Sequence, residues 1–512
     1  MRFFLVLSSL TLLTLPSLTF AQTQTVSIRP ADFATGDRFG SVLDLADSQL
    51  LASARVEPSG TASRVYLFDA TTGAELWRVD EPEPGQLFGS SLALGSQFAF
   101  VGAPGTQVIP FGNPEGRVYA YERATGALAF TIESPSPASS LRFGDSLALT
   151  TGTLCVGAPL LSTVYLHDSL TGIAVGSILR PGGPSFSGFG GVLDASGSRL
   201  AVGETDTGAT SLSSTYLFET NGTPTLVDAI AGGLFSGAIG FEVAVNSTDF
   251  AGLSFQFQSV ELSGPSFAPG NLTLPSSLFA RDFGQLAAIA LNDSIALIGG
   301  VSEDLFVIDI SQVVALDPTT GEKLYELHHP DPPQDPRDSE FGSVLALDGS
   351  LAAVADSAHE VAGAANAGTV YVYDTTPQLP LLTEVAPYAF PGAFLPSPQV
   401  LNLALRAADT SAGDVYFLLA SLSGTTPGVV LDGLVLPLNV DNLTLATVNQ
   451  PNTAALQNTF GTFSTTPLEA SAITIPGLLL PGTEINFAFL TVEPTGIPFV
   501  NGVSKTVTIS IQ

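Results

Sequence analysis

The four histidines have the widest chemical scope in this sequence, because imidazole transfers protons and binds metals near neutral pH. His167 lies beside Asp168 at the end of a predicted strand, His328 and His329 precede a Pro-rich loop, and His359 lies in a long loop. No His-Glu-x-x-His or Cys/His spacing typical of a metal site is present. We therefore expect solvated histidines in loops and at strand ends, without a catalytic or metal-binding role.

Carboxylates gather in the segment 331–340, which contains Asp331, Asp335, Asp338 and Glu340 together with Arg337. Paired carboxylates could serve glycoside hydrolysis or bind a cation. The prolines of the segment favour another interpretation, a stiff and solvated connection between two structural units.

Cys155 is the only cysteine, so no internal disulfide can form. It lies in the apolar run Leu154–Val156 without a basic neighbour that would favour a reactive thiolate. We expect it to be a small buried hydrophobe. The sequence predicts no catalytic residue, no cofactor or cofactor-binding residue, and no metal ligand.

The elements that must position any functional side chain form a repeat that begins with Phe-Gly. Seven copies occur, 44 to 58 residues apart. A period near fifty with about four short apolar strands per unit is typical of a β-propeller blade. The sequence therefore predicts an all-β fold with a seven-bladed β-propeller. The copies start at Phe39-Gly40, Phe88-Gly89, Phe143-Gly144, Phe189-Gly190, the degenerate Ile239-Gly240, Phe283-Gly284 and Phe341-Gly342.

The third strand of a unit commonly ends in an acidic residue and a Thr-Gly turn, as in Asp69–Gly73 and Asp168–Gly172. The acidic side chain is expected to accept backbone N–H bonds within the turn. The last unit has Pro377 in place of this glycine, and Thr25–Ile28 precedes the first unit without a repeat of its own. We expect residues 25–29 to supply the outer strand of the seventh blade and so to close the ring.

Four segments are predicted along the chain: a secretory signal peptide at 1–21, the propeller at 22–378, a Pro-rich linker at 379–398 and a C-terminal β-sandwich at 399–512. The signal is indicated by Arg2, an apolar run and small residues before Gln22. The sandwich is indicated by strand-like runs at Val400–Leu405, Val415–Leu419, Val429–Leu436, Leu443–Val448, Ala472–Ile475, Ile485–Leu490 and Lys505–Ile511.

The chain is strongly acidic, with 47 Asp and Glu residues against 16 Lys and Arg residues and a net charge of −31. A negative field of this size disfavours nucleic acid and anionic membranes as partners. No long apolar stretch follows the signal peptide, so we expect no membrane span and a secreted or cell-surface location.

The repeats resemble the FG-GAP repeat family, named for Phe-Gly and Gly-Ala-Pro. Gly102-Ala103-Pro104 and Gly157-Ala158-Pro159 match the second motif fully, and the resemblance covers roughly residues 25–378. The family is best known from the seven-bladed propeller of integrin α-subunits and occurs in bacterial secreted proteins. Its calcium-binding members carry an acidic loop between the first two strands, where this chain has short turns such as Leu94–Gln97. Calcium sites are therefore not carried over.

Two further similarities are local. Val65–Trp77 looks like a strand-turn-strand unit of quinoprotein propellers, but the chain has a single tryptophan, so their repeated tryptophan docking should be missing and quinone binding is not implied. The segment Tyr416–Gly428 is similar to C-terminal regions of large bacterial secreted proteins, which suggests surface attachment or sorting.

Three functions remain open. The first is a secreted, non-enzymatic binding or adhesion protein whose partner is an extracellular protein or glycan. The second is an exported enzyme acting on polysaccharide, with carboxylates gathered from separate blades at the propeller mouth. The third is a structural surface protein without a specific ligand. Carboxylates that converge in one funnel would favour the enzyme.

Overall fold

The computed structural model divides the chain into two compact units that separate between Thr376 and Pro377. The structure describes residues 24–54, 63–84, 86–105, 116–135, 142–183, 188–204, 214–231, 239–254, 259–264, 272–274, 285–301, 312–318, 323–331, 339–375, 381–384, 399–407, 414–425, 428–431, 434–449, 451–453, 456–463, 468–475, 484–493, 500–504 and 507–510. The predicted signal peptide 1–21 lies outside these residues.

In the described part of the first unit, seven four-stranded antiparallel sheets follow one another along the chain. Sheet 1 contains β2 (Phe39–Ala46), β3 (Gln49–Ala54), β4 (Arg64–Asp69) and β5 (Glu75–Asp80); sheet 2 contains β6 (Ser91–Leu94), β7 (Phe98–Ala103), β8 (Arg117–Glu122) and β9 (Leu128–Glu133); sheet 3 contains β10 (Leu147–Thr150), β11 (Thr153–Ala158), β12 (Thr163–Asp168) and β13 (Ala174–Leu179); sheet 4 contains β14 (Phe189–Ser196), β15 (Arg199–Glu204), β16 (Ser214–Glu219) and β17 (Thr225–Ala231); sheet 5 contains β18 (Ile239–Val245), β19 (Phe250–Ser254), β20 (Ser259–Ser263) and β21 (Leu272–Leu274); sheet 6 contains β22 (Gln285–Leu291), β23 (Ala296–Val301), β24 (Gln312–Leu316) and β25 (Lys323–His328); and sheet 7 contains β26 (Leu345–Asp348), β27 (Leu351–Asp356), β28 (Thr369–Asp374) and β1 (Gln24–Ile28).

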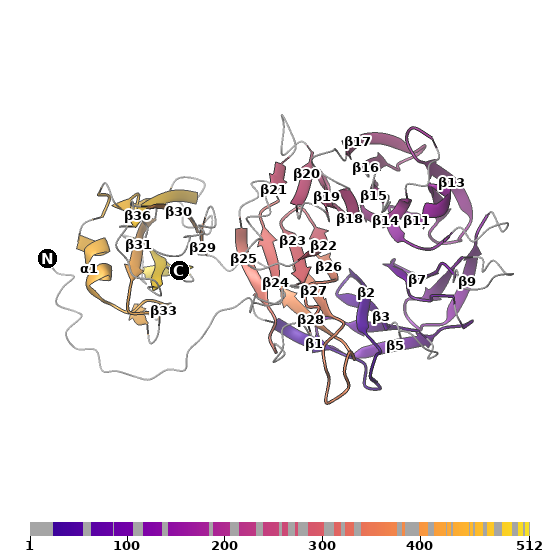
Figure 1. Cartoon of the computed structure of the whole chain (residues 1–512), viewed down its shortest axis with the longest axis horizontal. Coiled ribbons are helices and arrows are strands. Elements are labelled where there is room, and N and C mark those ends of the chain that lie inside the picture. Colours follow the sequence, from indigo (N-terminus) through magenta and orange to yellow (C-terminus); the bar gives the residue numbers. More distant parts are fainter. Residues whose placement is uncertain are drawn as a thin grey trace. The chain divides into compact units, whose positions relative to one another are not determined.

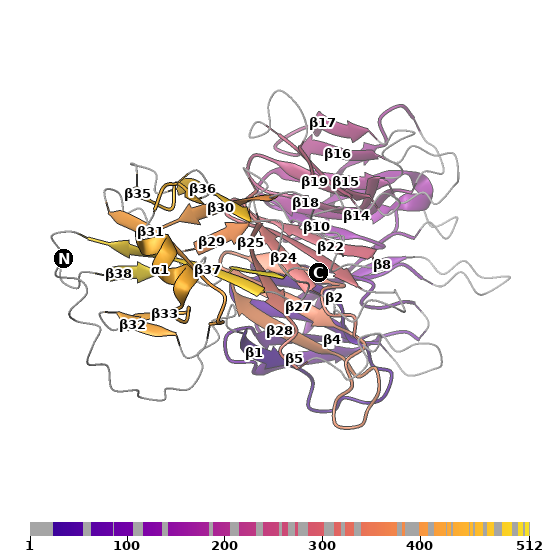
Figure 2. The same cartoon turned by 60° about the vertical axis from the view of Figure 1, so that its left-hand side comes forward.

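The sheets stand around a common centre, with the first strand of each sheet innermost and the fourth at the periphery (Figure 1). Sheet 7 takes its fourth strand from the opposite end of the unit. β1 pairs antiparallel with β28, with Val26 opposite Val372 and Ile28 opposite Val370, and the two strands lie side by side in both views (Figure 1 and Figure 2). The prediction that the N-terminal strand closes the ring is confirmed.

The Phe-Gly pair has two separate roles. Wherever the structure describes it, the phenylalanine is fully buried and packs against a tyrosine of the third strand in its own sheet; Phe88 packs edge-on against Tyr119 with ring centroids 5.7 Å apart. The glycine faces the preceding sheet: at Gly89, where φ is +79°, an added Cβ would lie 3.1 Å from the side chain of Ser53. Phe-Gly thus builds one sheet and packs it against its neighbour. The same aromatic contact joins Phe39 to Tyr66, Phe143 to Tyr165, Phe189 to Tyr216 and Phe341 to Tyr371.

Outer strands cover the turns of the following sheet. Trp77 of β5 lies over Gly126, where an added Cβ would be 2.9 Å from the indole, and its Nε1 donates a hydrogen bond to the Arg123 carbonyl at 2.8 Å. Phe130 of β9 covers Gly172 in the same way. The contact of Phe130 with Gly172 shows that a phenylalanine can cover this turn glycine in place of tryptophan.

The second unit contains two larger sheets, a hairpin and one helix among its described residues. One sheet has the order β29-β30-β36-β34, the other has the order β35-β31-β37-β38 with β39 also paired to β37, and β32 pairs with β33. The elements are β29 (Leu381–Glu384), β30 (Gln399–Arg406), β31 (Val415–Ser421), β32 (Val429–Leu431), β33 (Leu434–Leu436), α1 (Asn442–Asn449), β34 (Leu456–Gln457), β35 (Phe460–Thr462), β36 (Leu468–Ile475), β37 (Glu484–Val492), β38 (Val500–Val503) and β39 (Val507–Ser510).

Two expectations for this region were wrong. The run Leu443–Val448, predicted as a strand from its alternating residues, lies in α1, because Asp441 caps the helix by accepting the N–H bonds of Leu443 and Thr444 at 2.9 Å. Leu381–Glu384, predicted as part of the linker 379–398, forms β29 and pairs with β30. The prolines bound this short apolar run without interrupting it. No described helix has the length and hydrophobicity that a membrane crossing requires.

Candidate functional site: the central channel

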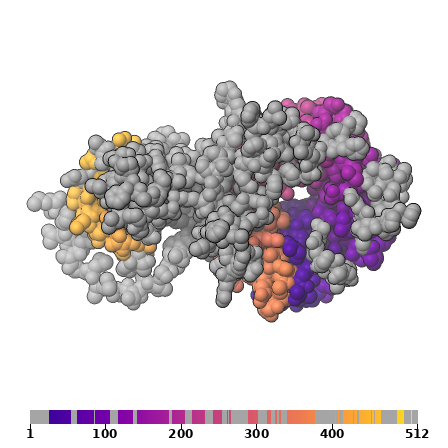
Figure 3. All heavy atoms as spheres, in the orientation of Figure 1, coloured from indigo at the N-terminus to yellow at the C-terminus, as the bar shows by residue number. Residues whose placement is uncertain are grey.

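The first strands of the seven sheets line a cavity of about 460 Å³ on the axis of the ring. Residues of β2, β6, β10, β14, β18, β22 and β26 all contribute to its wall. The space-filling view shows this passage open at the centre of the ring (Figure 3). Most of its lining residues are aliphatic or alanine, and the acidic residues among them are Asp44, Asp145, Asp194 and Glu242.

Two acidic residues of the channel lie at the sixth position of their repeats. This position is alanine in five sheets and aspartate in sheets 1 and 4, at Asp44 and Asp194. Both aspartates accept a backbone hydrogen bond from the next sheet. Asp44 accepts the N–H of Leu94 at 2.5 Å, and Asp194 accepts the N–H of Val245 at 2.8 Å. Each donor is the seventh residue of the next repeat, so each carboxylate joins the inner strands of two neighbouring sheets.

Two serines connect sheets in a related way at the fourth repeat position. Ser91 donates its hydroxyl hydrogen to the Gly144 carbonyl, and Ser146 donates to the Gly190 carbonyl, both at 2.7 Å. Both serines are buried. Polar residues on the inner strands therefore hold successive sheets together, and a polar side chain in the channel is not by itself a ligand contact.

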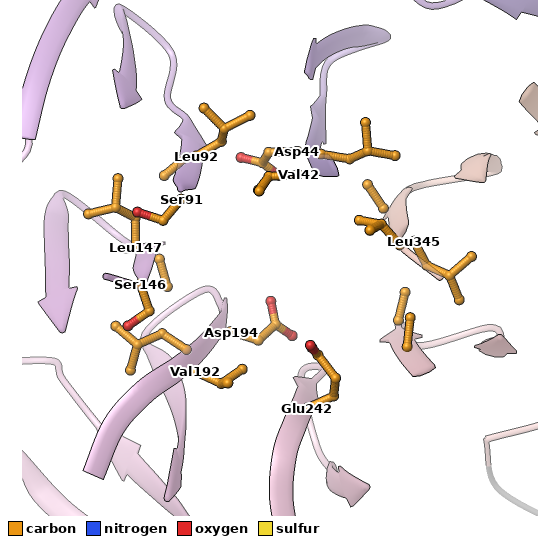
Figure 4. A pocket seen from close by; sticks show the side chains of 18 of the residues that line it. Val42, Asp44, Ser91, Leu92, Ser146, Leu147, Val192, Asp194, Glu242 and Leu345 are labelled. Atoms are coloured by element: carbon orange, nitrogen blue, oxygen red, sulfur yellow. The ribbon is translucent and has the colours of Figure 1, made fainter. Parts of the chain in front are cut away.

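Glu242 occupies the fourth repeat position in sheet 5, and its carboxyl points toward that of Asp194 across the cavity wall (Figure 4). Burial, followed by the negative charge of Asp194, raises the pKa of Glu242 to about 8. Burial likewise raises the pKa of Asp194 to about 7 and that of Asp44 to about 6, against the backbone hydrogen bonds that lower them. At neutral pH Glu242 is therefore mostly protonated and can donate a hydrogen bond or a proton.

The structure contradicts the expectation of solvated histidines at three positions. His167, His329 and His359 are 3%, 5% and 8% exposed. They are buried because aromatic side chains and the next sheet cover the strand ends: the His167 ring lies 6.0 Å from that of Phe143, and the His329 ring lies 4.9 Å from that of Tyr371. The side chain of His328 lies outside the described residues.

The acidic segment 331–340 does not form a paired-carboxylate site in its described part. Asp331 is exposed, and Glu340 forms an ion pair with Arg38 that bridges sheets 7 and 1. Asp335, Arg337 and Asp338 lie outside the described residues. The prediction for Cys155 is confirmed, since the residue is fully buried and burial raises the pKa of its thiol to about 12.

The turn aspartates act as predicted. Asp69 accepts the N–H bonds of Thr71 and Thr72 at 2.9 Å, and Asp168 accepts that of Thr171 at 2.9 Å. Hydrogen bonds from the hydroxyls of Thr71 and Thr171, followed by these backbone bonds, lower the pKa of both carboxyls. Their role is local structure.

Sequence reasoning missed the channel carboxyls. Their signal was present as a departure from alanine at the sixth repeat position, which becomes visible once the seven copies are aligned. Glu242 carried a weaker signal, because Ile239-Gly240 is the degenerate copy of the repeat.

Residues 61–214 match a family described as outer membrane protein assembly factor BamB. A solved structure described as the crystal structure of RRP9 WD40 repeats covers 68% of this chain and 97% of its own chain, at 12% identity and a TM-score of 0.43. No curated protein matches the chain. Together with the ring of four-stranded sheets, the family match defines the Gln22–Thr376 unit as a β-propeller built from repeats.

Proposed function

We propose that this chain is an exported, non-enzymatic binding protein. In this proposal a seven-bladed propeller of the FG-GAP type presents a recognition face to an extracellular protein or glycan. A C-terminal β-sandwich follows the propeller. The proposal rests above all on the difference between the two ends of the sheets.

The turn face, defined by the connections from first to second and from third to fourth strands, has short and regular connections. The connections from first to second strands are two to four residues long, and those from third to fourth strands are five to eight residues long. The loop face is defined by the connections from second to third strands and by those between sheets. The former are 4 to 13 residues long, and the latter are 7 to 16 residues long. Variable loops on a rigid scaffold are the usual place for recognition. The ligand is therefore assigned to the loop face.

Observations on the two units support the structural part of the proposal, which is the seven blades and the C-terminal β-sandwich. Seven four-stranded sheets among the described residues support seven blades. In the second unit, one buried cluster contains Leu403 of β30 together with Leu418 of β31 and Phe487 of β37, so both larger sheets contribute to one core. A core shared by two sheets is the defining feature of a β-sandwich.

Export and partner class are inferred from the sequence. The segment 1–21 has the pattern of a cleavable signal, and a net charge of −31 favours neutral or basic partners over polyanions. The proposed partner is thus an extracellular protein or an uncharged glycan.

The test is a panel of immobilised glycans and extracellular proteins probed with the full chain, with ligand integrity measured by mass spectrometry. Saturable binding with an unchanged ligand is expected. Absence of saturable binding throughout the panel would contradict the proposal and favour a structural surface protein.

A second candidate function has one observation in its favour. Asp194 and Glu242 converge in the channel, and a carboxyl with a pKa near 8 is protonated at neutral pH, as a general acid in glycoside hydrolysis must be. Against it, Asp194 already accepts the N–H of Val245. Cleavage of a glycan by the wild type and its loss in Glu242→Gln would establish the enzyme, and an intact ligand would exclude it.

A further inference from the structure

Two buried histidines and a buried aspartate meet between sheets 6 and 7, away from the channel. His329 directly follows β25, Asp356 ends β27, and His359 lies in the loop that follows β27. Asp356 is fully buried, and the two histidines are at most 8% exposed. This cluster could not be predicted from the sequence, because the two histidines lie 30 positions apart and no motif connects them.

The donor atoms are close enough to share a metal ion. His329 Nε2 lies 2.9 Å and His359 Nδ1 lies 3.7 Å from the same oxygen, Asp356 Oδ2, and all three atoms lie within 4.8 Å of one another. Two ligands of a tetrahedral Zn²⁺ ion, each about 2.1 Å from the metal, are roughly 3.4 Å apart. The observed separations of 2.9 Å and 3.7 Å lie on either side of that spacing.

His359 Nδ1 is buried and has no hydrogen-bond partner in the described structure. It faces Asp356 at a separation too long for a hydrogen bond. A buried polar atom without a partner is unfavourable, and a cation shared with the carboxylate would satisfy this imidazole nitrogen. Asp356 itself also accepts hydrogen bonds from the Ser339 hydroxyl and from the N–H of Glu340, so its Oδ2 would be shared between Ser339 and the ion.

The corresponding position in sheet 4 shows how this fold neutralises a buried acid. Glu204 ends β15 as Asp356 ends β27, and it is also fully buried. It forms an ion pair with Arg180, which directly follows the outer strand of the preceding sheet. In sheet 7 the residue in the place of Arg180 is His329, which supplies no permanent charge. Among the described residues, Asp356 therefore lacks the direct guanidinium contact that Glu204 has, and the charge of Arg29 acts on the cluster only from a longer distance.

We propose that His329, Asp356 and His359 form a site for a divalent cation of the Zn²⁺ class, with a fourth position open to another ligand. Imidazole and carboxylate are the ligands that such a cation prefers. The ion would link the end of β25 in sheet 6 to β27 and the loop after it in sheet 7, the sheet that β1 completes.

Binding requires one local rearrangement. His329 Nδ1 accepts the N–H of Asp331 at 3.0 Å, so its proton lies on Nε2 and is donated to Asp356. Coordination through Nε2 moves this proton to Nδ1, which breaks the contact with Asp331 without a net change in protonation. Asp331 is exposed, so its peptide can turn away. The rearranged Nδ1–H can then donate to a carbonyl or to water, as metal-bound histidines do.

The test uses the full-length, tag-free chain after treatment with a chelator. One equivalent of Co²⁺ is expected to give the visible absorption of a four-coordinate site, and Zn²⁺ is expected to remove that absorption and raise Tm. His359→Ala should weaken Zn²⁺ binding at least tenfold. His167→Ala removes another buried histidine, in sheet 3, and should leave the affinity unchanged.

The wild-type Co²⁺ spectrum decides the question even if a variant does not fold. Absence of the absorption band at saturating Co²⁺ would overturn the proposal. So would a folded His359→Ala chain that binds Zn²⁺ as tightly as the wild type.

Discussion

The carboxylate of Asp194 accepts the backbone N–H of Val245 at 2.8 Å and thereby joins the inner strands of sheets 4 and 5. Asp44 makes the equivalent bond to Leu94 between sheets 1 and 2. Five sheets have alanine at this position. The two aspartates therefore join two pairs of sheets, as the hydroxyls of Ser91 and Ser146 join two others.

Asp194→Ala should destabilise the propeller by about 1–3 kcal/mol at pH 5.5, because the N–H of Val245, which is buried, loses its acceptor. Urea denaturation followed by circular dichroism measures the change. Glu133→Ala, at an exposed acid of β9, is the control and should stay within about 0.5 kcal/mol of the wild type. Equal effects of the two substitutions would contradict the role of Asp194 as a link between sheets.

The channel carboxyls should make the fold less stable as pH rises. Their pKa values in the folded chain, about 6 for Asp44, 7 for Asp194 and 8 for Glu242, lie above the ordinary values of 3.8 and 4.5. The folded state therefore holds more protons than the unfolded state between about pH 4 and pH 8, and this contribution to stability is lost as pH rises through the folded-state values. Wild-type protein should have a lower urea midpoint at pH 8.5 than at pH 5.5.

The double substitution Asp194→Asn with Glu242→Gln isolates this effect. Both amides keep the shape and an acceptor oxygen, but neither ionises. The difference between the two urea midpoints should shrink in the variant. A difference as large as that of the wild type would show that the pH dependence arises elsewhere.

Alanine substitutions at Gly126 and Gly152 distinguish the cost of backbone strain from the cost of steric contact with a neighbouring side chain. Both have positive φ, at +72° and +76°, but an added Cβ meets the Trp77 ring at Gly126 and nothing within 4 Å at Gly152. Gly152→Ala should cost about 1 kcal/mol from backbone strain, and Gly126→Ala should cost more because Trp77 must move. Trp77 is the only tryptophan, so its fluorescence should shift to the red in Gly126→Ala alone. An unshifted spectrum would contradict the docking of Trp77 on this turn.

Closure by β1 makes a prediction about association. A chain that begins at residue 29 lacks the strand that covers β28, including Ile28, which is 1% exposed. It should unfold at a lower temperature and associate through the open sheet edge. Calorimetry and light scattering measure both effects. The matched control begins at Gln22 and should remain as stable as the full chain; a monomeric, equally stable truncation at residue 29 would contradict closure.

The repeat architecture was predictable because its signals are local. Phe-Gly, the turn aspartates and the apolar strands each act within one repeat or between neighbours, so their spacing determines the ring and the closing role of residues 25–29. Helix α1 was not predicted, because the alternating run Leu443–Val448 is equally suited to a strand and a single cap at Asp441 decides between them. The candidate sites were not predicted for a different reason. Asp194 and Glu242, like His329 and His359, become neighbours only when separate sheets assemble.

The most direct test of the central claim compares the two faces of the propeller. Leu160→Arg combined with Glu360→Arg places two exposed cations on the loop face, and Gln97→Arg combined with Asn221→Arg places two on the turn face. The Kd of each double variant is measured against a ligand from the binding panel. Recognition by the loop face predicts at least tenfold weaker binding for the first variant and an unchanged Kd for the second. Equal Kd values for the wild type and both variants would contradict it.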